Sequence, residues 1–261
     1  MNLIDKQCKR IKSEKRLGLM MHVVLGYPSL EASRQLILAM AQNRVDFIEM
    51  QIPFSDPLGD GPVIRLANTA SLSAGFRTKQ AFMLAKKLRR KDKVEIPLLF
   101  MTYFNIVFNY GVKKFCADAQ AAGVNGLIIP DYPSAAETHD HLSKYAKKYN
   151  LQLIEFVSLD SAPADIKRAA KTARGFVYCF AQRGVTGRRQ QMLEELGGHL
   201  KRLKKYIKIP LAVGFGISRP EHLANLKGKA DIGIVGSAVL EEYNRRGLSG
   251  AVGLGGRLRN G

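Results

Sequence analysis

The chain has 261 residues, 46% of them hydrophobic, so it can bury the core of one barrel or of two smaller domains. No run of about eighteen apolar residues occurs and the first sixteen residues carry many charges, so the sequence predicts neither a membrane span nor a signal peptide and favours a cytoplasmic protein. The three cysteines, Cys8, Cys116 and Cys179, have no metal-ligand spacing. This argues against a metal site or a disulfide framework and predicts packed, reduced thiols.

The charge balance is strongly basic, with 41 Lys and Arg against 22 Asp and Glu and a formal net charge of +19. Such a charge would suit a polyanion. However, the basic residues are spread over many segments, such as 86–93 and 201–208, and the chain has no tryptophan. Because a nucleic-acid platform interleaves aromatic and basic side chains, the pattern disfavours nucleic acid and favours a small phosphorylated substrate.

Eight short apolar segments are predicted to be strands, and each is followed by at least one predicted helix. A helix over 2–16 precedes the first strand and is expected to cap the bottom of the sheet. The glycine-rich tail, 245–261, is expected to be poorly ordered or only partly helical. The predicted strands are 20–26, 47–51, 97–101, 126–129, 152–157, 176–180, 209–213 and 232–235. The predicted helices that follow them are 30–44, 63–74, 79–90, 112–121, 135–148, 163–172, 191–205, a short helix opened by Pro220, and 237–243.

This strand and helix alternation requires a parallel sheet, and eight units without a break in composition predict a single closed (β/α)8 (TIM) barrel domain over residues 1–261. A doubly wound sheet would more often show a glycine fingerprint after the first strand. The sequence GYPSLE at 26–31 is not one. Because the chemistry of a barrel lies at the C-terminal ends of its strands, the residues that follow each strand are the candidates for function.

The stretch FIEMQIPFSDPLGDGP, 47–62, places Glu49 inside a buried strand and two further acids on the loop after it. A buried carboxylate is costly unless it has a partner or a raised pKa, so Glu49 is a catalytic candidate or the structural partner of a buried cation or hydroxyl. Asp60 either faces the site or shapes its turn. Asp56, between Ser55 and Pro57, is better suited to shaping the loop or to an interface.

Other titratable residues are weaker candidates. Asp131 follows the fourth predicted strand, where it either serves the site or hydrogen-bonds its own turn. His22 could reach the pocket from the first strand or pack as a neutral side chain. The remaining histidines lie in predicted helices and are expected to be solvent-exposed bystanders: His139, His141, His199 and His222.

Three glycine-bearing loops follow the last three strands: GVTG at 184–187, GFGIS at 214–218 and GS at 236–237. An anion needs backbone N–H groups at close range, which glycine allows, and a helix N-terminus directed at it. Barrels commonly bind phosphate in this part of the fold. The three loops together therefore predict a phosphate cradle.

In this order and at these separations, PFSDPLGDGPVI, NYG, IIPDYP, RGVTG, GFGIS and VGSAV resemble the alpha subunit of tryptophan synthase, over roughly residues 15–243. The resemblance implies a barrel that cleaves indole-3-glycerol phosphate into indole and glyceraldehyde 3-phosphate. It also implies no cofactor in this chain and a beta subunit that carries pyridoxal phosphate and receives the indole in an alpha2beta2 tetramer.

The resemblance also assigns roles by position. Glu49 matches the general acid/base, Asp60 the loop carboxylate facing the indole N–H, and Tyr178 a tyrosine that buttresses the site. The phosphate-binding positions correspond to Gly187, Gly216, Gly236 and Ser237, and Thr186 matches a mobile loop that closes over Asp60. The positions near the partner surface correspond to Asp56, Tyr103, Asn105 and Asn109.

The chain departs from the family's usual residues around both acids. Gln51 replaces a glycine and is expected to crowd or reposition Glu49, and Gly59 replaces an alanine and is expected to make the Asp60 loop more mobile. His22 occupies a position that is often aromatic or apolar. Two alternative functions stay open: a different sugar-phosphate isomerase or epimerase, and a barrel with weakened catalysis that serves as an allosteric partner.

Overall fold

The computed structural model describes residues 1–132, 137–158, 161–180, 189–214 and 216–260, and within these ranges it shows nine strands, all paired in parallel. Their order in the sheet is β5-β4-β3-β2-β1-β9-β8-β7-β6. The strands are β1 (Gly18–Val24), β2 (Phe47–Gln51), β3 (Leu98–Met101), β4 (Gly126–Ile128), β5 (Gln152–Leu153), β6 (Glu155–Ser158), β7 (Val177–Phe180), β8 (Leu211–Gly214) and β9 (Ile232–Val235).

The sheet closes through its fifth segment. Only Ile154 separates β5 from β6, so the two are halves of the single strand predicted over 152–157. β5 pairs with β4 through Gly126 and Gln152, whereas β6 pairs with β7 through Phe156 and Tyr178. One interrupted strand therefore carries both edges of the sheet, and the prediction of an eight-segment barrel is confirmed.

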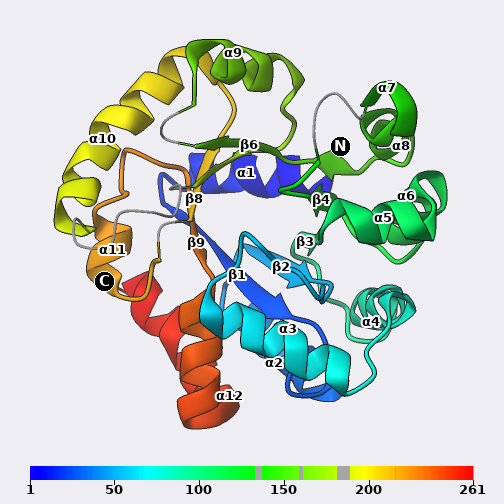
Figure 1. The fold of residues 1–261 in the computed structure, drawn as a ribbon. Helices are drawn as coiled ribbons and strands as arrows, with labels where there is room; N and C mark the ends of the chain where they lie inside the picture. The colour runs from blue at the N-terminus through cyan, green and yellow to red at the C-terminus, as the bar shows by residue number, and fades with distance from the viewer. Residues whose placement is uncertain (133–136, 159–160, 181–188, 215, 261) are drawn as a thin grey trace.

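Helices form a ring around the strands (Figure 1). Ser29 caps the first helix of this ring, as its hydroxyl accepts a hydrogen bond from the Ala32 N–H at 3.1 Å. Within the described ranges the ring consists of α2 (Leu30–Gln42), α3 (Pro62–Ser73), α4 (Thr78–Arg90), α5 (Phe104–Tyr110), α6 (Val112–Ala121), α7 (Glu137–Asp140), α8 (Leu142–Lys148), α9 (Pro163–Thr172), α10 (Arg189–Tyr206), α11 (Pro220–Ala224) and α12 (Ser237–Asn260).

Two helices differ from the sequence-based expectation. The continuous helix predicted over 135–148 is wrong in its described part, because α7 and α8 are separated at His141, whose φ of 54° is left-handed. The short helix α5 is absent from the prediction. The carboxylate of Asp131 accepts a hydrogen bond from the Phe104 N–H at 2.8 Å, which satisfies a donor at the start of α5. A capping group 27 residues away leaves no local sequence signal.

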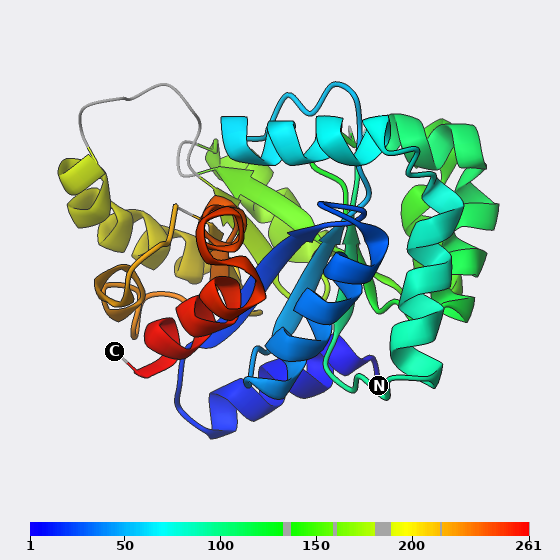
Figure 2. The same ribbon diagram turned by 90° about the horizontal axis from the view of Figure 1, so that it is seen from below.

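The predicted N-terminal cap is confirmed as α1 (Leu3–Ser13), which lies across one end of the barrel while α3 lies near the other (Figure 2). Its buried face consists of Ile4, Cys8 and Ile11. The Asn2 side chain accepts a hydrogen bond from the Ile4 N–H and donates to the carbonyls of Asn125 and Asn150, at 2.9 and 2.7 Å. These bonds fasten α1 to the loops that lead into β4 and β5.

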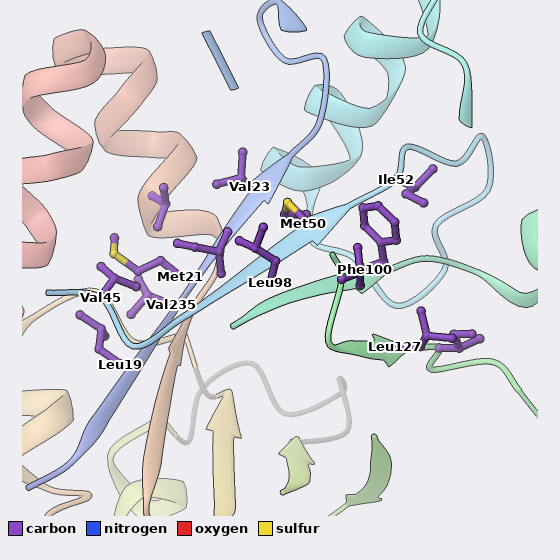
Figure 3. Close-up of a cluster of buried hydrophobic side chains, with 14 of the residues drawn as sticks. Leu19, Met21, Val23, Val45, Met50, Ile52, Leu98, Phe100, Leu127 and Val235 are labelled. Atoms are coloured by element: carbon purple, nitrogen blue, oxygen red, sulfur yellow. The ribbon is translucent and has the colours of Figure 1, made fainter. Parts of the chain in front are cut away.

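The apolar core has two layers. Side chains on the outer faces of neighbouring strands form one continuous cluster beneath the helices, part of which is shown in Figure 3. A second cluster fills the barrel interior, where the rings of Phe47 and Phe176 meet edge to face at 5.8 Å. Burial raises the pKa of the Cys116 thiol to about 12, and all three cysteines are buried and free, as expected for packed thiols.

Across the described part of the chain, we find no helix that combines the length and the apolar character needed to cross a bilayer.

The described part of the glycine-rich tail belongs to α12 and is helical except at Gly247 (φ 63°), where two helical parts meet. Ala251, Leu254 and Leu258 are buried, and a Cβ at Gly255 would lie 3.3 Å from the Met21 sulfur. The apolar spacing of three and four residues gives the tail a core-facing stripe, and glycine allows close approach to β1. The expectation of low order gave too little weight to this stripe.

We expect Leu254→Ala to lower the free energy of unfolding by about 2–5 kcal/mol, because it leaves a cavity where α12 packs on the barrel. Chemical denaturation followed by circular dichroism measures this loss. The exposed Ser249→Ala on the same helix is the control and is expected to change stability by less than about 0.5 kcal/mol. Equal stability of the two variants would show that the tail does not dock.

Candidate active site

A row of polar side chains lies inside the barrel on the first two strands. Parallel pairing places His22 of β1 opposite Glu49 of β2, and Gln51 lies two residues further along the same face of β2. All three are buried, with exposures of 3%, 3% and 0%. The interior is therefore apolar around Phe47 and polar towards the C-terminal ends of the strands, where barrel enzymes carry their chemistry.

Hydrogen bonds join these side chains into a chain. His22 Nδ1 lies 2.9 Å from Glu49 Oε2, and His22 Nε2 lies 3.0 Å from Gln51 Oε1. Gln51 Nε2 donates to Asp60 Oδ2 at 2.6 Å. Gln51 was expected to crowd Glu49, but its amide bonds to His22 and Asp60 instead. The two acids that the sequence singles out are thus connected through two side chains.

Asp60 reaches this interior from the loop between β2 and α3. It is 7% exposed, and burial raises the pKa of its carboxyl group above the usual value although Gln51 opposes the shift. Beside it, the Tyr103 hydroxyl accepts a hydrogen bond from the Gly59 N–H at 3.3 Å, and the Tyr103 ring stacks on Phe54 at 5.0 Å. The greater mobility expected from Gly59 stays a prediction.

Tyr178 of β7 faces the same interior, where its ring packs on Phe156 at 5.1 Å between centroids. Burial raises the pKa of Tyr178 well above its usual value, and the nearby charges of Glu49 and Asp60 raise it further. The phenol is therefore a neutral hydrogen-bonding group. The three predicted catalytic residues, Glu49, Asp60 and Tyr178, come together in one site.

His22 is the basic side chain in this site. Burial disfavours protonation of its imidazole, but the hydrogen bond and charge of Glu49, followed by the charge of Asp60, raise the pKa of His22 above its usual value. His22 is packed, at 3% exposure, and its ring lies beside Glu49 in the barrel interior, so its position agrees with parts of both expectations. Sequence alone gives no signal for its bond to Gln51, because that contact depends on how β1 and β2 are paired.

The described part of the predicted phosphate cradle lies after β8 and β9. Gly216 has a φ of 61°, which favours glycine, and Gly236 and Ser237 lie half-buried where β9 passes into α12. The first N–H groups of a helix lack partners within the helix and attract anions. Thr186 and Gly187 lie outside the described residues.

The four predicted partner-surface residues differ in exposure. Asp56, Asn105 and Asn109 are exposed, whereas Tyr103 is 4% exposed and packs inside the Asp60 loop. Two apolar side chains that the sequence analysis did not single out are exposed in the same segments: Leu58 at 91% and Phe108 at 57%. Exposed large apolar residues beside polar ones are typical of an interaction surface.

The other weaker candidates agree only in part with the expectations. Asp131 accepts a hydrogen bond from the Phe104 N–H at the start of α5 and, among the described residues, makes no bond to its own turn. His139 is exposed, whereas His141, His199 and His222 are partly exposed, and His222 Nδ1 accepts a hydrogen bond from the Ser218 N–H at 3.2 Å.

Comparisons with known proteins identify the family of the chain. The family model described as tryptophan synthase alpha chain matches residues 8–251. The chain is 44% identical to the tryptophan synthase alpha chain of Desulfotalea psychrophila over 94% of both chains, and 39% identical to that of Desulforapulum autotrophicum over 95% of this chain and 96% of the other.

Solved structures give the same result. Tryptophan synthase from Mycobacterium tuberculosis superposes with a TM-score of 0.90 at 30% identity, covering 98% of this chain and 96% of that one. Tryptophan synthase subunit alpha from Legionella pneumophila gives a TM-score of 0.91 at 28% identity, covering 100% and 98%. With a family match over most of its length, relatives of 39–44% identity and a shared barrel, this chain belongs to the tryptophan synthase alpha chain family.

Proposed function

We propose that the chain is a carbon–carbon lyase that cleaves indole-3-glycerol phosphate to indole and glyceraldehyde 3-phosphate. Family membership supports this reaction. The observation that carries it is the convergence of Glu49 and Asp60, joined through Gln51 and His22, at the C-terminal end of the barrel strands. The cleavage needs two acidic groups acting on one aromatic ring.

Glu49 acts as the general acid/base of this reaction. The indole C3 must gain a proton before the bond to the glycerol carbon breaks, and the neighbouring hydroxyl must lose one as it becomes a carbonyl. His22 holds Glu49 Oε2, and among the described residues no hydrogen-bond donor reaches Oε1. The Glu49 carboxyl group is therefore held by His22 through one of its two oxygens.

Asp60 stabilises the intermediate. Once C3 is protonated the ring nitrogen becomes positive, and a carboxylate beside its N–H lowers the energy of that cation in a site shielded from water. Gln51 holds the Asp60 carboxylate by the 2.6 Å hydrogen bond. Tyr178 supports the pocket wall as a neutral phenol.

The phosphate is held by Gly216, Gly236 and Ser237 together with Thr186 and Gly187. The N-terminus of α12 supplies backbone donors, and Ser237 adds a hydroxyl. For Thr186 we propose the role that its place in the GVTG motif implies, which is to help exclude water during the reaction.

The chain works with a beta subunit that takes up the indole, in an alpha2beta2 tetramer in which pyridoxal phosphate belongs to the partner. Asp56, Asn105 and Asn109 belong to the contact surface. The exposed Leu58 and Phe108 supply its apolar area. Tyr103 acts on this surface from beneath, through its contact with the Asp60 loop.

An indole-release assay with purified chain and indole-3-glycerol phosphate, with and without a beta subunit, tests the function and the partnership together. We expect indole formation by the chain alone and faster turnover in the complex. Stimulation of the beta subunit without any cleavage would instead favour the allosteric barrel. Turnover of sugar phosphates that lack an indole ring would favour an isomerase or epimerase.

We expect Ser237→Ala to raise KM for the phosphorylated substrate about tenfold with little change in kcat, because a hydrogen bond to a charged group contributes about 1.5 kcal/mol to binding. Steady-state kinetics of indole release measure both constants. Ser249→Ala, on the exposed side of the same helix, should match the parent chain. An unchanged KM in Ser237→Ala would show that the Ser237 hydroxyl does not bind the phosphate.

A further inference from the structure

The direction of each hydrogen bond between the two acids is fixed by chemistry. Gln51 donates through Nε2 to Asp60 Oδ2 at 2.6 Å, so its carbonyl oxygen Oε1 must face His22 Nε2, 3.0 Å away. A carbonyl only accepts, so His22 Nε2 carries a hydrogen. The other ring nitrogen, Nδ1, lies 2.9 Å from Glu49 Oε2. One exchangeable proton therefore lies between Nδ1 and Oε2.

We propose that His22 and Gln51 are positioning residues that link Glu49 to Asp60, and that His22 stores the proton which Glu49 delivers to the substrate. This rests on the lyase function proposed above, since it assigns to Glu49 the role of acid. The proposal adds His22 as the residue that supplies the proton to Glu49.

The surroundings of His22 favour storage of a proton. Glu49 faces the imidazole from β2, and Asp60 faces it from the loop that precedes α3. On the opposite wall, Tyr178 is held neutral by burial and by these two carboxylates. Both acids thus favour the imidazolium, and together they outweigh the cost of burying it. With an exposure of 3%, His22 exchanges protons with Glu49 rather than directly with bulk water.

The proposed catalytic cycle uses one proton, returns it, and needs no co-reactant. The proton on Nδ1 passes to Glu49, whose carboxyl group protonates indole C3 and leaves His22 neutral. The Glu49 carboxylate then takes the proton of the glycerol hydroxyl as the carbon–carbon bond breaks, and the bonding electron pair returns to the ring. That proton moves back to Nδ1. The site ends the cycle with the one proton with which it began.

Gln51 determines which ring nitrogen of His22 faces Glu49 with its exchangeable proton. Because its amide bonds to both Asp60 and His22, it keeps the hydrogen on Nε2 and leaves Nδ1 for Glu49. The same amide draws Asp60 into the barrel interior. Replacing Gln51 by an apolar side chain of similar size removes both effects at once.

A spectroscopic test does not depend on turnover. In 15N-histidine-labelled full-length protein, the His22 signals are identified by their loss in His22→Gln. We expect the His22 signals to report protonation of both ring nitrogens up to a pH above the reference imidazole pKa of about 6.5. The signals of the exposed His139 are followed in the same titration. Loss of the Nδ1 proton of His22 at or below that reference value would overturn the proposal.

Kinetics test the consequence for catalysis. His22→Gln keeps an amide donor but cannot store a proton, so we expect kcat to fall about tenfold or more with KM changed less than about threefold. The alkaline limb of the kcat pH profile should move to lower pH, because the variant lacks the imidazolium that resupplies the proton of Glu49. His139→Gln should leave the rate and the profile unchanged.

A double variant tests whether the two residues act as one unit. If they do, His22→Gln/Gln51→Leu should lose little more activity than the more damaging single variant. Fully additive losses, or a His22→Gln profile like that of the parent chain, would overturn the link while leaving the lyase function intact. A parent chain that releases no indole would overturn the lyase function, and the ring-nitrogen signals would then still decide whether His22 holds the proton.

Discussion

A Glu49→Gln variant is expected to fold normally and to lower kcat for indole release about 10²- to 10⁴-fold. The amide has the size of the carboxylate and can still hydrogen-bond to His22, but it can neither give a proton to indole C3 nor take one from the glycerol hydroxyl. Because the lost interaction belongs to the transition state, kcat should fall far more than KM changes.

Indole release measured by steady-state kinetics, beside a thermal unfolding curve, separates lost chemistry from lost structure. The matched control is Glu95→Gln, which makes the same chemical change at an exposed position outside the barrel interior. The control should keep the parent rate. A Glu49→Gln variant with near-normal turnover and an unchanged unfolding temperature would remove Glu49 from the mechanism.

Local patterns in the sequence predict most of the secondary structure, because those patterns are themselves the cause of the elements. The strand predicted over 47–51 matches β2 at both ends, and Ser29 caps α2 as its hydroxyl predicts. The elements that differ depend on distant contacts. The start of α5 is satisfied by Asp131, and the tail helix is stabilised where Leu254 and Leu258 enter the core.

In the candidate site, too, local features could be predicted from sequence and distant contacts could not. Glu49 and Asp60 could be nominated from sequence because a buried acid in a strand and an acid in a Gly- and Pro-rich loop are each unusual in their own segments. The hydrogen bonds that connect these two acids could not be predicted in this way. They require His22 to lie beside Glu49 and Gln51, which the pairing of β1 with β2 decides. The expectation that Gln51 crowds Glu49 took only their shared strand into account. The hydrogen-bond partners of Gln51 come from β1 and from the loop after β2.

The opposite end of the barrel contains a third buried carboxylate, Asp46, whose contacts are structural. It is 2% exposed and accepts two hydrogen bonds from Arg16 at 2.7 Å and one from the Leu19 N–H at 2.9 Å. Arg259 of α12 adds a fourth at 2.9 Å and Gln7 of α1 a fifth at 2.5 Å. One carboxylate therefore joins the segment after α1, the start of β1 and the end of the chain.

We expect Asp46→Asn to lower the free energy of unfolding by about 3–5 kcal/mol, because it removes the charge that compensates two guanidinium groups and turns one acceptor oxygen into a donor facing them. For a chain of this size the melting temperature should fall by roughly 10 °C. Thermal unfolding followed by circular dichroism measures the shift.

The control is Asp118→Asn, which breaks the exposed pair with Lys114 and is expected to cost about 0–1 kcal/mol. If both variants melted together, Asp46 would be no more than another surface ion pair. If only Asp46→Asn melted early while its indole release at low temperature stayed normal, stability and chemistry would be assigned to opposite ends of the barrel.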